Sequence, residues 1–181
     1  KFAAHIIKTG ADIAVVVTPN NPTAMAVPKS DLIRLAENLS GHDCLLIIDE
    51  SFIDFVQDPD QISGQTSMED KIEMYPNIAI FKSMSKAYGI CGLRIGYLLT
   101  RNSNFIKAVR QGIHIWNING FAEEFLRILP DYRDVFIKSC DQVKKDRDKL
   151  YQDLSTFSEL TVYKPDANFI FCKLPDSGPN A

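Results

Sequence analysis

The segment "FKSMSKAYGICGLRIGY" at residues 81–97 joins two apolar, β-prone runs, "NIAIF" at 77–81 and "LRIGYLL" at 93–99. Lys86 and Arg94 therefore fall in a small-residue connection between two predicted strands. A solvated charge is more usual on an exposed helix face, whereas loops carried by a rigid scaffold hold most binding residues. The two cations at this junction indicate a bound ligand.

Two further strands are predicted upstream of this segment. "IAVVVTP" at 13–19 and "CLLIID" at 44–49 are continuously apolar, which is typical of strands buried on both faces of a sheet. Between them, Pro28 can open a helix whose apolar side chains recur at helical spacing, namely Leu32, Leu35, Ala36 and Leu39. Strands that alternate with helices predict an α/β fold whose sheet is mainly parallel and flanked by helices.

The pattern changes after residue 100. Residues 104–112 and 121–154 are predicted to be helical, with a break at Pro130, and two short strands follow, "LTVYKP" and "NFIFCKL". We predict that residues 1–130 form part of a large domain. Residues 131–181 then form a linking helix and the start of a small α+β C-terminal domain, and the acidic stretch at 57–70 is a loop or a helix start. We expect the chain to be a fragment of a longer protein.

Composition excludes several classes of function. The net charge is −3 and no basic cluster is interleaved with aromatic residues, which argues against nucleic-acid binding. No apolar run is long enough to span a bilayer, so no membrane partner is predicted. Three histidines lack ligand spacing, so no metal is predicted either. Four scattered cysteines without a CxxC motif favour reduced thiols and a cytoplasmic location.

Polar residues follow or begin the predicted strands, at the places where ligands bind in open α/β sheets. The set holds an amide, a carboxylate, two hydroxyls, an amine and a guanidinium, from Asn21, Asp49, Ser83, Ser85, Lys86 and Arg94. An amine can bond an aldehyde cofactor, and a buried carboxylate can keep a pyridine nitrogen protonated. A guanidinium with hydroxyl donors suits a phosphate. These groups together fit pyridoxal 5'-phosphate.

Three segments carry a resemblance to a known family. "NNPT" at 20–23, "IIDESFIDF" at 47–55 and "SMSKAYGICGLRIGY" at 83–97 resemble, in order and spacing, the signature segments of class I/II aminotransferases, which are pyridoxal-phosphate enzymes of fold type I. "WNING" and "KPDANFIFCKLP" are similar to the branch that holds histidinol-phosphate aminotransferase and threonine-phosphate decarboxylase. The likeness covers about residues 18–174.

The resemblance implies a role for each matching residue. Lys86 would be the Schiff-base lysine and proton shuttle, and Asp49 would pair with the pyridinium nitrogen. Asn21 would bond the cofactor's phenolic oxygen, while Ser83 and Arg94 would hold its phosphate. The implied activity is transfer of an amino group from an amino acid to a 2-oxo acid, with those small molecules as substrates, in a homodimer.

Two residues depart from the family pattern. Phe52 stands where the family often has a tyrosine that helps to bond the phenolic oxygen, and it looks more like the threonine-phosphate decarboxylase side. Ala24 replaces the glycine that usually follows "NPT". The resemblance also implies that a phosphate-capping loop precedes Lys1 and that a carboxylate-binding arginine follows Ala181. Decarboxylation of a phosphorylated amino acid, or a truncated non-catalytic domain, are therefore the alternatives within this fold.

Other interpretations remain for the same residues. Asp49 could cap a helix or pair with a cation, and Ser83 and Ser85 could satisfy turn amides. "LLIIDE" is similar to a Walker B strand, but the GxxxxGK[ST] loop that must accompany it does not occur in these 181 residues. "SMSK" matches the S-x-x-K of acyl-serine enzymes, yet "KTG" precedes it where that family needs it to follow.

Overall fold

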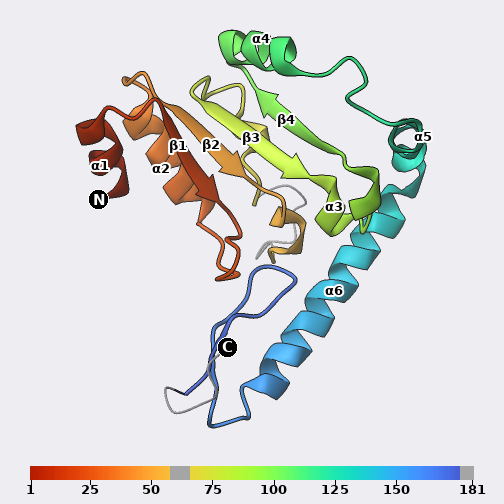
Figure 1. The fold of residues 1–181 in the computed structure, drawn as a ribbon. Coiled ribbons are helices and arrows are strands. Elements are labelled where there is room, and N and C mark those ends of the chain that lie inside the picture. The colour runs from red at the N-terminus through yellow and green to blue at the C-terminus, as the bar shows by residue number, and fades with distance from the viewer. Residues whose placement is uncertain (58–65, 176–181) are drawn as a thin grey trace.

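The computed structural model describes residues 1–57 and 66–175 and has the predicted α/β architecture (Figure 1). A four-stranded sheet runs in the order β1-β2-β3-β4. The strands are β1 (Ile13–Val17), β2 (Leu45–Asp49), β3 (Ile78–Ser83) and β4 (Gly96–Thr100). The first three are parallel, and β4 is antiparallel to β3. The mainly parallel sheet flanked by helices is therefore confirmed.

The connection between β3 and β4 lacks the helix that a parallel return would need. Parallel neighbours are usually joined by a crossover that contains a full helix. Here the connection holds only the four-residue helix α3 (Met84–Ala87) and the 3-10 turn η3 (Cys91–Leu93). Gly96 pairs with Ser83, and a Cβ at Gly96 would lie 2.7 Å from the carbonyl oxygen of Lys82. Only glycine fits at this close approach of the two strands.

One face of the sheet packs against two helices. These are α1 (Phe2–Thr9), which the sequence did not lead us to predict, and α2 (Lys29–Leu39), which begins just after Pro28 as predicted. The buried core consists of alternate strand residues and one stripe from each helix, including Ile6, Leu32, Ala36, Leu39, Leu46, Ile48, Ile78 and Ile80. Alternate residues of the strands and the helically spaced residues of α2 thus pack against each other in one apolar layer.

The prediction that the first strand is buried on both faces was wrong for this chain. Ala14 is buried, but Ile13 and Val15 are 53% and 54% exposed. The reason is that α1 and α2 both contribute to the core on the Ala14 side of the sheet. An uninterrupted apolar run indicates that both faces suit burial, but it does not supply the layer that buries them.

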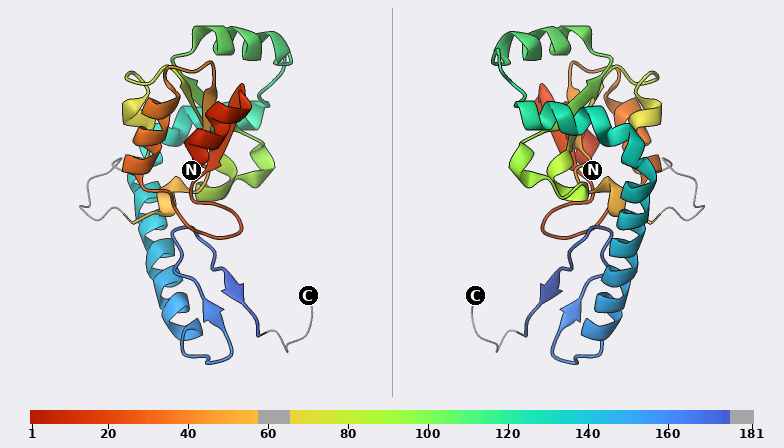
Figure 2. Two further views of the ribbon diagram at one scale, coloured as in Figure 1. Left: turned by 90° about the vertical axis from the view of Figure 1, so that its left-hand side faces the viewer. Right: turned by 90° about the vertical axis from the view of Figure 1, so that its right-hand side faces the viewer.

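Helical structure continues after β4. The elements are α4 (Ser103–Gly112), α5 (Gly120–Ile128), the 3-10 turn η4 (Leu129–Tyr132) and the 22-residue helix α6 (Arg133–Leu154). The predicted break at Pro130 is confirmed, because η4 separates the two helices there. Helix α6 runs away from the sheet, with a small hairpin beside its far end (Figure 1 and Figure 2).

That hairpin is shorter than predicted. Strands β5 (Thr161–Val162) and β6 (Cys172–Lys173) pair antiparallel over two residues each. In the connection between the two strands, the backbone carbonyls of Asp166 and Ala167 accept hydrogen bonds from Arg147. The division into domains at residues 130 and 131 stays a prediction.

Two predictions concern segments that are mostly loop. Of the acidic stretch at 57–70, residues 58–65 lie outside the described residues, and the described part contains the 3-10 turn η2 (Glu69–Lys71). A further 3-10 turn, η1 (Ile53–Phe55), follows β2.

All four cysteines are free thiols. None of the described helices combines the length and apolar character that crossing a membrane requires.

Candidate active site

The predicted site residues gather at one edge of the sheet. Asp49 and Ser83 are the last residues of the neighbouring strands β2 and β3, and Lys86 lies in α3 directly after β3. Arg94 lies just before β4, and the antiparallel direction of β4 brings its start to the same edge. Asn21 lies in the turn after β1, which is parallel to β2. Strand direction therefore collects five residues from three segments of the chain at one edge.

Ser51 orients the Asp49 carboxylate. Its backbone N–H and its hydroxyl both donate to Oδ1 of Asp49, at 2.9 and 2.6 Å. The Ser51 hydroxyl oxygen in turn accepts from the N–H of Ser83 at 3.0 Å. Among the described residues, Oδ2 of Asp49 accepts no hydrogen bond, so it can receive a donor from a ligand. We did not predict this role for Ser51, although a serine two residues after an aspartate is a frequent turn signal.

The amine of Lys86 lies over the aromatic ring of Phe52. Its Nζ lies 5.7 Å from the centroid of the Phe52 ring, within cation–π range. Phe52 is only 8% exposed and meets Phe169 edge to face, with ring centroids 5.2 Å apart. Lys86 itself is an exposed residue, although its Nζ lies over the buried Phe52 ring. The arrangement leaves the amine open to an incoming aldehyde.

Ser83 and Arg94 flank the start and end of the α3 connection. The Ser83 hydroxyl caps α3 by accepting from the N–H of Ser85 at 3.3 Å, so the turn-amide alternative describes its contact here. Arg94 is exposed, adopts a left-handed backbone with φ 55°, and donates from Nη1 to the carbonyl of Cys91 at 3.2 Å. Both groups can still turn toward a phosphate at this edge, which stays a prediction.

Asn119 ties the next helix to this loop. Its Nδ2 donates to the carbonyl of Leu93 at 2.9 Å, and its Oδ1 caps α5 by accepting from the N–H of Ala122 at 2.9 Å. The asparagine belongs to the "WNING" segment, and an N-cap asparagine before an apolar helix is a readable signal. Its effect is to fix the backbone immediately before Arg94.

A buried polar network lies beside these residues. Glu50 follows Asp49 and is fully buried, and its carboxylate accepts from the Ser67 hydroxyl at 2.5 Å and the Met68 N–H at 2.7 Å. Burial raises the pKa of the Glu50 carboxyl, and these two hydrogen bonds offset part of that effect. Lys82 pairs with Asp54 at 2.9 Å, which joins β3 to η1. We did not predict this network.

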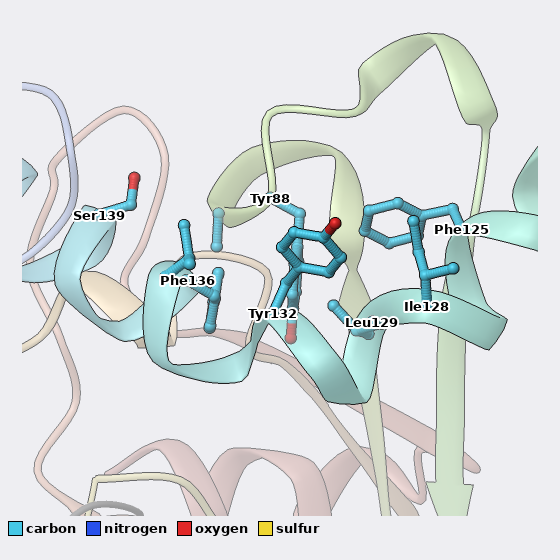
Figure 3. Close-up of a pocket in the computed structure, with 9 residues that line it drawn as sticks. Tyr88, Phe125, Ile128, Leu129, Tyr132, Phe136 and Ser139 are labelled. Atoms are coloured by element: carbon cyan, nitrogen blue, oxygen red, sulfur yellow. The ribbon is translucent and has the colours of Figure 1, made fainter.

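An apolar pocket of about 330 Å³ lies between α3, α5, η4 and α6 (Figure 3). Tyr88 stacks on Phe136 in its wall, with ring centroids 4.0 Å apart. Burial raises the pKa of Tyr88 to about 12. Because no carboxylate, amine or guanidinium lines it, the pocket lacks the groups that a phosphorylated cofactor needs. It is an open apolar pocket next to the helix that carries Lys86, and the exposed side chains of Tyr132 and Val135 form part of its lining.

The chemical groups at this edge of the sheet are of the types that pyridoxal phosphate needs for binding. They include an open carboxylate oxygen on Asp49, an accessible amine on Lys86 and an exposed guanidinium on Arg94. Asn21 adds an exposed amide in the neighbouring turn. Within residues 1–57 and 66–175, no three His, Cys, Asp or Glu side chains cluster as a metal ion requires. The individual roles of these residues stay predictions.

Comparison with known proteins identifies relatives of the whole chain. CMP-5'-(3-aminopropyl)phosphonate synthase of Streptomyces rubellomurinus is 44% identical over 96% of this chain and 27% of that relative. L-serine phosphate decarboxylase of Sulfurospirillum multivorans is 34% identical over 97% of this chain and 44% of that relative. The structure of the histidinol-phosphate aminotransferase from Clostridium acetobutylicum superposes with a TM-score of 0.85 and 28% identity, over 96% of this chain and 52% of that one.

The chain thus spans between 27% and 52% of the length of these proteins. The model of the family described as aminotransferase class I and II matches residues 5–178. That family uses pyridoxal 5'-phosphate as its cofactor, and the predicted resemblance and fold type are confirmed. With nearly all of its length matched, this chain belongs to the class I and II aminotransferase family of pyridoxal-phosphate enzymes.

Proposed function

We propose that the full-length protein binds pyridoxal phosphate through Lys86 and removes the α-carboxylate of a phosphorylated amino acid. The observation that supports the cofactor role is the placement of Asp49 and Lys86 at the ends of adjacent strands, with the Asp49 carboxylate oriented by Ser51. A carboxylate and an amine from neighbouring strand ends can reach opposite sides of one small aromatic ring. Strand ends at one edge of an α/β sheet are also where such ligands bind.

Each residue then has a defined task. When bound, the cofactor supplies an aldehyde and a ring that accepts an electron pair. Asp49 would hold a proton on the ring nitrogen through its charge, and Lys86 Nζ would be the amine that bonds the aldehyde. Arg94 and Ser83 would hold the phosphate, and the Asn21 amide would donate to the phenolic oxygen. In decarboxylation Lys86 delivers a proton to the substrate α-carbon, whereas in transamination it first takes one from that carbon.

Two observations favour decarboxylation. A relative at 34% identity is named as an L-serine phosphate decarboxylase. Another, at 44%, is named for a product with an aminopropyl group and a phosphonate. Phe52 adds to this, because the apolar wall beneath Lys86 lacks the tyrosine hydroxyl that the family often places there. The proposed reaction consumes one proton, releases carbon dioxide and leaves a primary amine that keeps its phosphate.

Transamination is the second candidate. The likeness to a histidinol-phosphate aminotransferase, with a TM-score of 0.85, favours it. The same Lys86 and Asp49 would serve, with an amino acid as donor and a 2-oxo acid as acceptor. The two reactions differ in which bond to the α-carbon breaks, and the groups that select that bond contact the substrate carboxylate.

Covalent trapping tests the cofactor site. Full-length protein is incubated with pyridoxal phosphate, reduced with borohydride and mapped by peptide mass. We expect the pyridoxyl group on Lys86, its loss in Lys86→Ala, and its retention in Lys107→Ala, which removes a lysine from the exposed face of α4. A folded protein that carries the group on another lysine would overturn the assignment.

Product analysis separates the candidate reactions. Full-length protein loaded with pyridoxal phosphate, and not treated with borohydride, is supplied with phosphorylated and ordinary amino acids, with and without a 2-oxo acid, and products are followed by NMR. Carbon dioxide and a primary amine, formed without any 2-oxo acid, support decarboxylation. Products that require a 2-oxo acid support transamination. Labelled Lys86 without turnover supports the third alternative, a non-catalytic domain that keeps its cofactor.

We also propose that the full-length protein is a cytoplasmic homodimer. The segment between α4 and α5 supports an interface, because it exposes large apolar side chains, with Ile115 98% and Trp116 93% exposed, and Phe121 at the start of α5 is also exposed. Contiguous apolar surface of this kind marks contact sites. Light scattering on full-length protein with Trp116→Ser tests this, and a dimer that persists unchanged argues against this segment as the interface.

A further inference from the structure

A loop from beyond α6 reaches back to the turn that carries Asn21. The N–H of Asp166 donates to the carbonyl of Ala24 at 2.7 Å, and Oδ2 of Asp166 accepts from the N–H of Ala26 at 2.8 Å. The two contacts lie on either side of Met25, and the second joins residues 140 positions apart. Figure 1 and Figure 2 both show this loop meeting the turn between β1 and α2. Asp166 thus holds the segment that directly follows the Asn21 turn at two points.

Arg147 of α6 holds Asp166 in place. Arg147 is 6% exposed, and its Nη1 donates to the carbonyls of Phe55 at 2.7 Å, Asp166 at 3.2 Å and Ala167 at 3.3 Å. Nη2 lies 2.8 Å from the carboxylate of Asp148, which balances the buried charge. A guanidinium that satisfies several acceptors in a fixed fork ties their backbones together. Helix α6 therefore joins η1 to the Asp166 loop.

Apolar packing joins this contact to the floor of the site. Ala24 of the turn and Ala167 of the loop are both fully buried, in one cluster with Phe52. Phe169 of the same loop packs edge to face on Phe52, and Lys86 Nζ stands over that ring. The Asn21 turn and the 166–169 loop are thus packed as one body under Lys86.

We propose that Asp166, fixed by Arg147, is a positioning residue that holds the Asn21 amide at the cofactor's phenolic oxygen. This inference rests on the proposed role of Asn21. Asn21 is itself exposed, and its turn is closed internally by the 2.7 Å bond from the N–H of Ala24 to the carbonyl of Asn20. The two Asp166 bonds add constraint from outside the turn. Without the carboxylate, Ala26 N–H is left to water and the turn opens more often.

Hydrogen exchange tests the contact without the cofactor. In cofactor-free full-length protein, Asp166→Ala is expected to speed exchange of the Ala26 amide by about tenfold, because a hydrogen bond to a charged acceptor is lost. Asp166→Asn restores protection, since its amide oxygen can accept the same bond. Asp153→Ala, an exposed carboxylate of α6, is the matched control. Unchanged exchange at Ala26 in Asp166→Ala would overturn the proposal.

The cofactor's absorption tests the positioning of Asn21. We expect Asn21→Ala and Asp166→Ala to move the pH midpoint of that absorption in the same direction. The double variant moves no further than Asn21→Ala alone, because Asp166 acts through Asn21. Arg147→Lys, which keeps the charge but not the fork of donors, gives a smaller shift of the same kind and serves if Asp166→Ala does not fold.

The outcomes separate this inference from the proposed function. Shifts that add in the double variant, when a separately reduced sample of the same protein carries the label on Lys86, would overturn the positioning role and leave the cofactor site intact. Folded protein without a Lys86 label would overturn the cofactor site and with it the role of Asn21. The exchange rate at Ala26 then still decides whether Asp166 holds the turn.

Discussion

The hydroxyl of Ser51 donates a 2.6 Å hydrogen bond to Oδ1 of Asp49 and accepts one of 3.0 Å from the N–H of Ser83. One side chain thus connects the ends of β2 and β3, whose terminal residues are both predicted cofactor ligands. Because carboxylate orientation and strand spacing depend on the same hydroxyl, the two ligand positions cannot vary independently. Ser51 thus fixes the relative positions of Asp49 and Ser83 at this edge of the sheet.

We expect Ser51→Ala to lower the free energy of unfolding by about 1–2 kcal/mol, because the Ser83 N–H loses its acceptor and Asp49 keeps only one donor. Urea unfolding of full-length protein measures this. Ser40→Ala is the control, since its hydroxyl bonds a carbonyl at the exposed end of α2, and surface changes of that kind stay within about 0.5 kcal/mol. Equal effects from the two variants would mean that the Ser51 bridge is not formed in solution.

Ala24 occupies a backbone conformation that suits glycine. Its φ is 59°, and its methyl group is fully buried beside Phe52. A left-handed conformation costs a residue with a Cβ about 1–2 kcal/mol, while burial of one methyl group contributes about 0.8 kcal/mol. The strain and the packing therefore nearly cancel at this position, which explains how alanine can stand where the family usually has glycine.

We accordingly expect Ala24→Gly to leave the free energy of unfolding within about 1 kcal/mol of the parent. Ala167→Gly is the matched control, because Ala167 is equally buried in the same cluster but is not among the described residues with positive φ. It should be destabilising by about 1–2 kcal/mol through lost packing and added freedom of the unfolded chain. Chemical denaturation measures the free energy of unfolding of both variants. Equal decreases in the two variants would contradict backbone strain at Ala24.

The sequence was sufficient to predict the elements that local pattern determines. The apolar run before Asp49 and the helical spacing after Pro28 are local signals, and the structure confirms both. Asp49, Ser83 and Lys86 could be named because polar residues that follow such runs stand out. Parallel strands end at the same edge of a sheet, so the predicted topology was enough to expect these three residues close together.

Contacts between distant segments could not be predicted in the same way. Asp166 reads as an ordinary turn residue after Pro165, and only folding brings it to Ala26. Arg147 lies in a mixed-charge run that is typical of a solvated helix face, yet it is buried because three carbonyls converge on it. A charge is buried where partners from elsewhere satisfy it, and a local pattern contains no record of those partners.

Phe52 offers a direct test of what faces the cofactor. We expect Phe52→Tyr in the loaded full-length protein to shift the pH midpoint of the cofactor's absorption, because the new hydroxyl can donate to the phenolic oxygen. Phe125→Tyr is the control, since that ring lines the apolar pocket beyond Tyr88. A titration of Phe52→Tyr that coincides with the parent would show that this ring does not face the phenolic oxygen.

Glu50 should make stability depend on pH. Burial raises the pKa of its carboxyl above the value of 4.5 expected for an unfolded chain. Between those two pKa values the unfolded state has lost the proton and the folded state retains it. Unfolding then releases a proton, so the free energy of unfolding falls as pH rises through this interval and levels off once folded Glu50 has ionised.

Glu50→Gln removes this titration and keeps the contacts, because its amide can accept from the Met68 N–H and donate to the Ser67 hydroxyl. We expect the variant to gain stability relative to the parent as pH rises above about 4.5, with a constant difference once folded Glu50 has ionised. Urea unfolding from pH 4 to pH 8 measures the difference, in which all other titrations cancel. Glu159→Gln, at an exposed residue, should track the parent throughout. If the Glu50→Gln curve also stays parallel to the parent, the carboxyl of Glu50 is reached by water in the folded protein, and the buried bridge to Ser67 does not describe it.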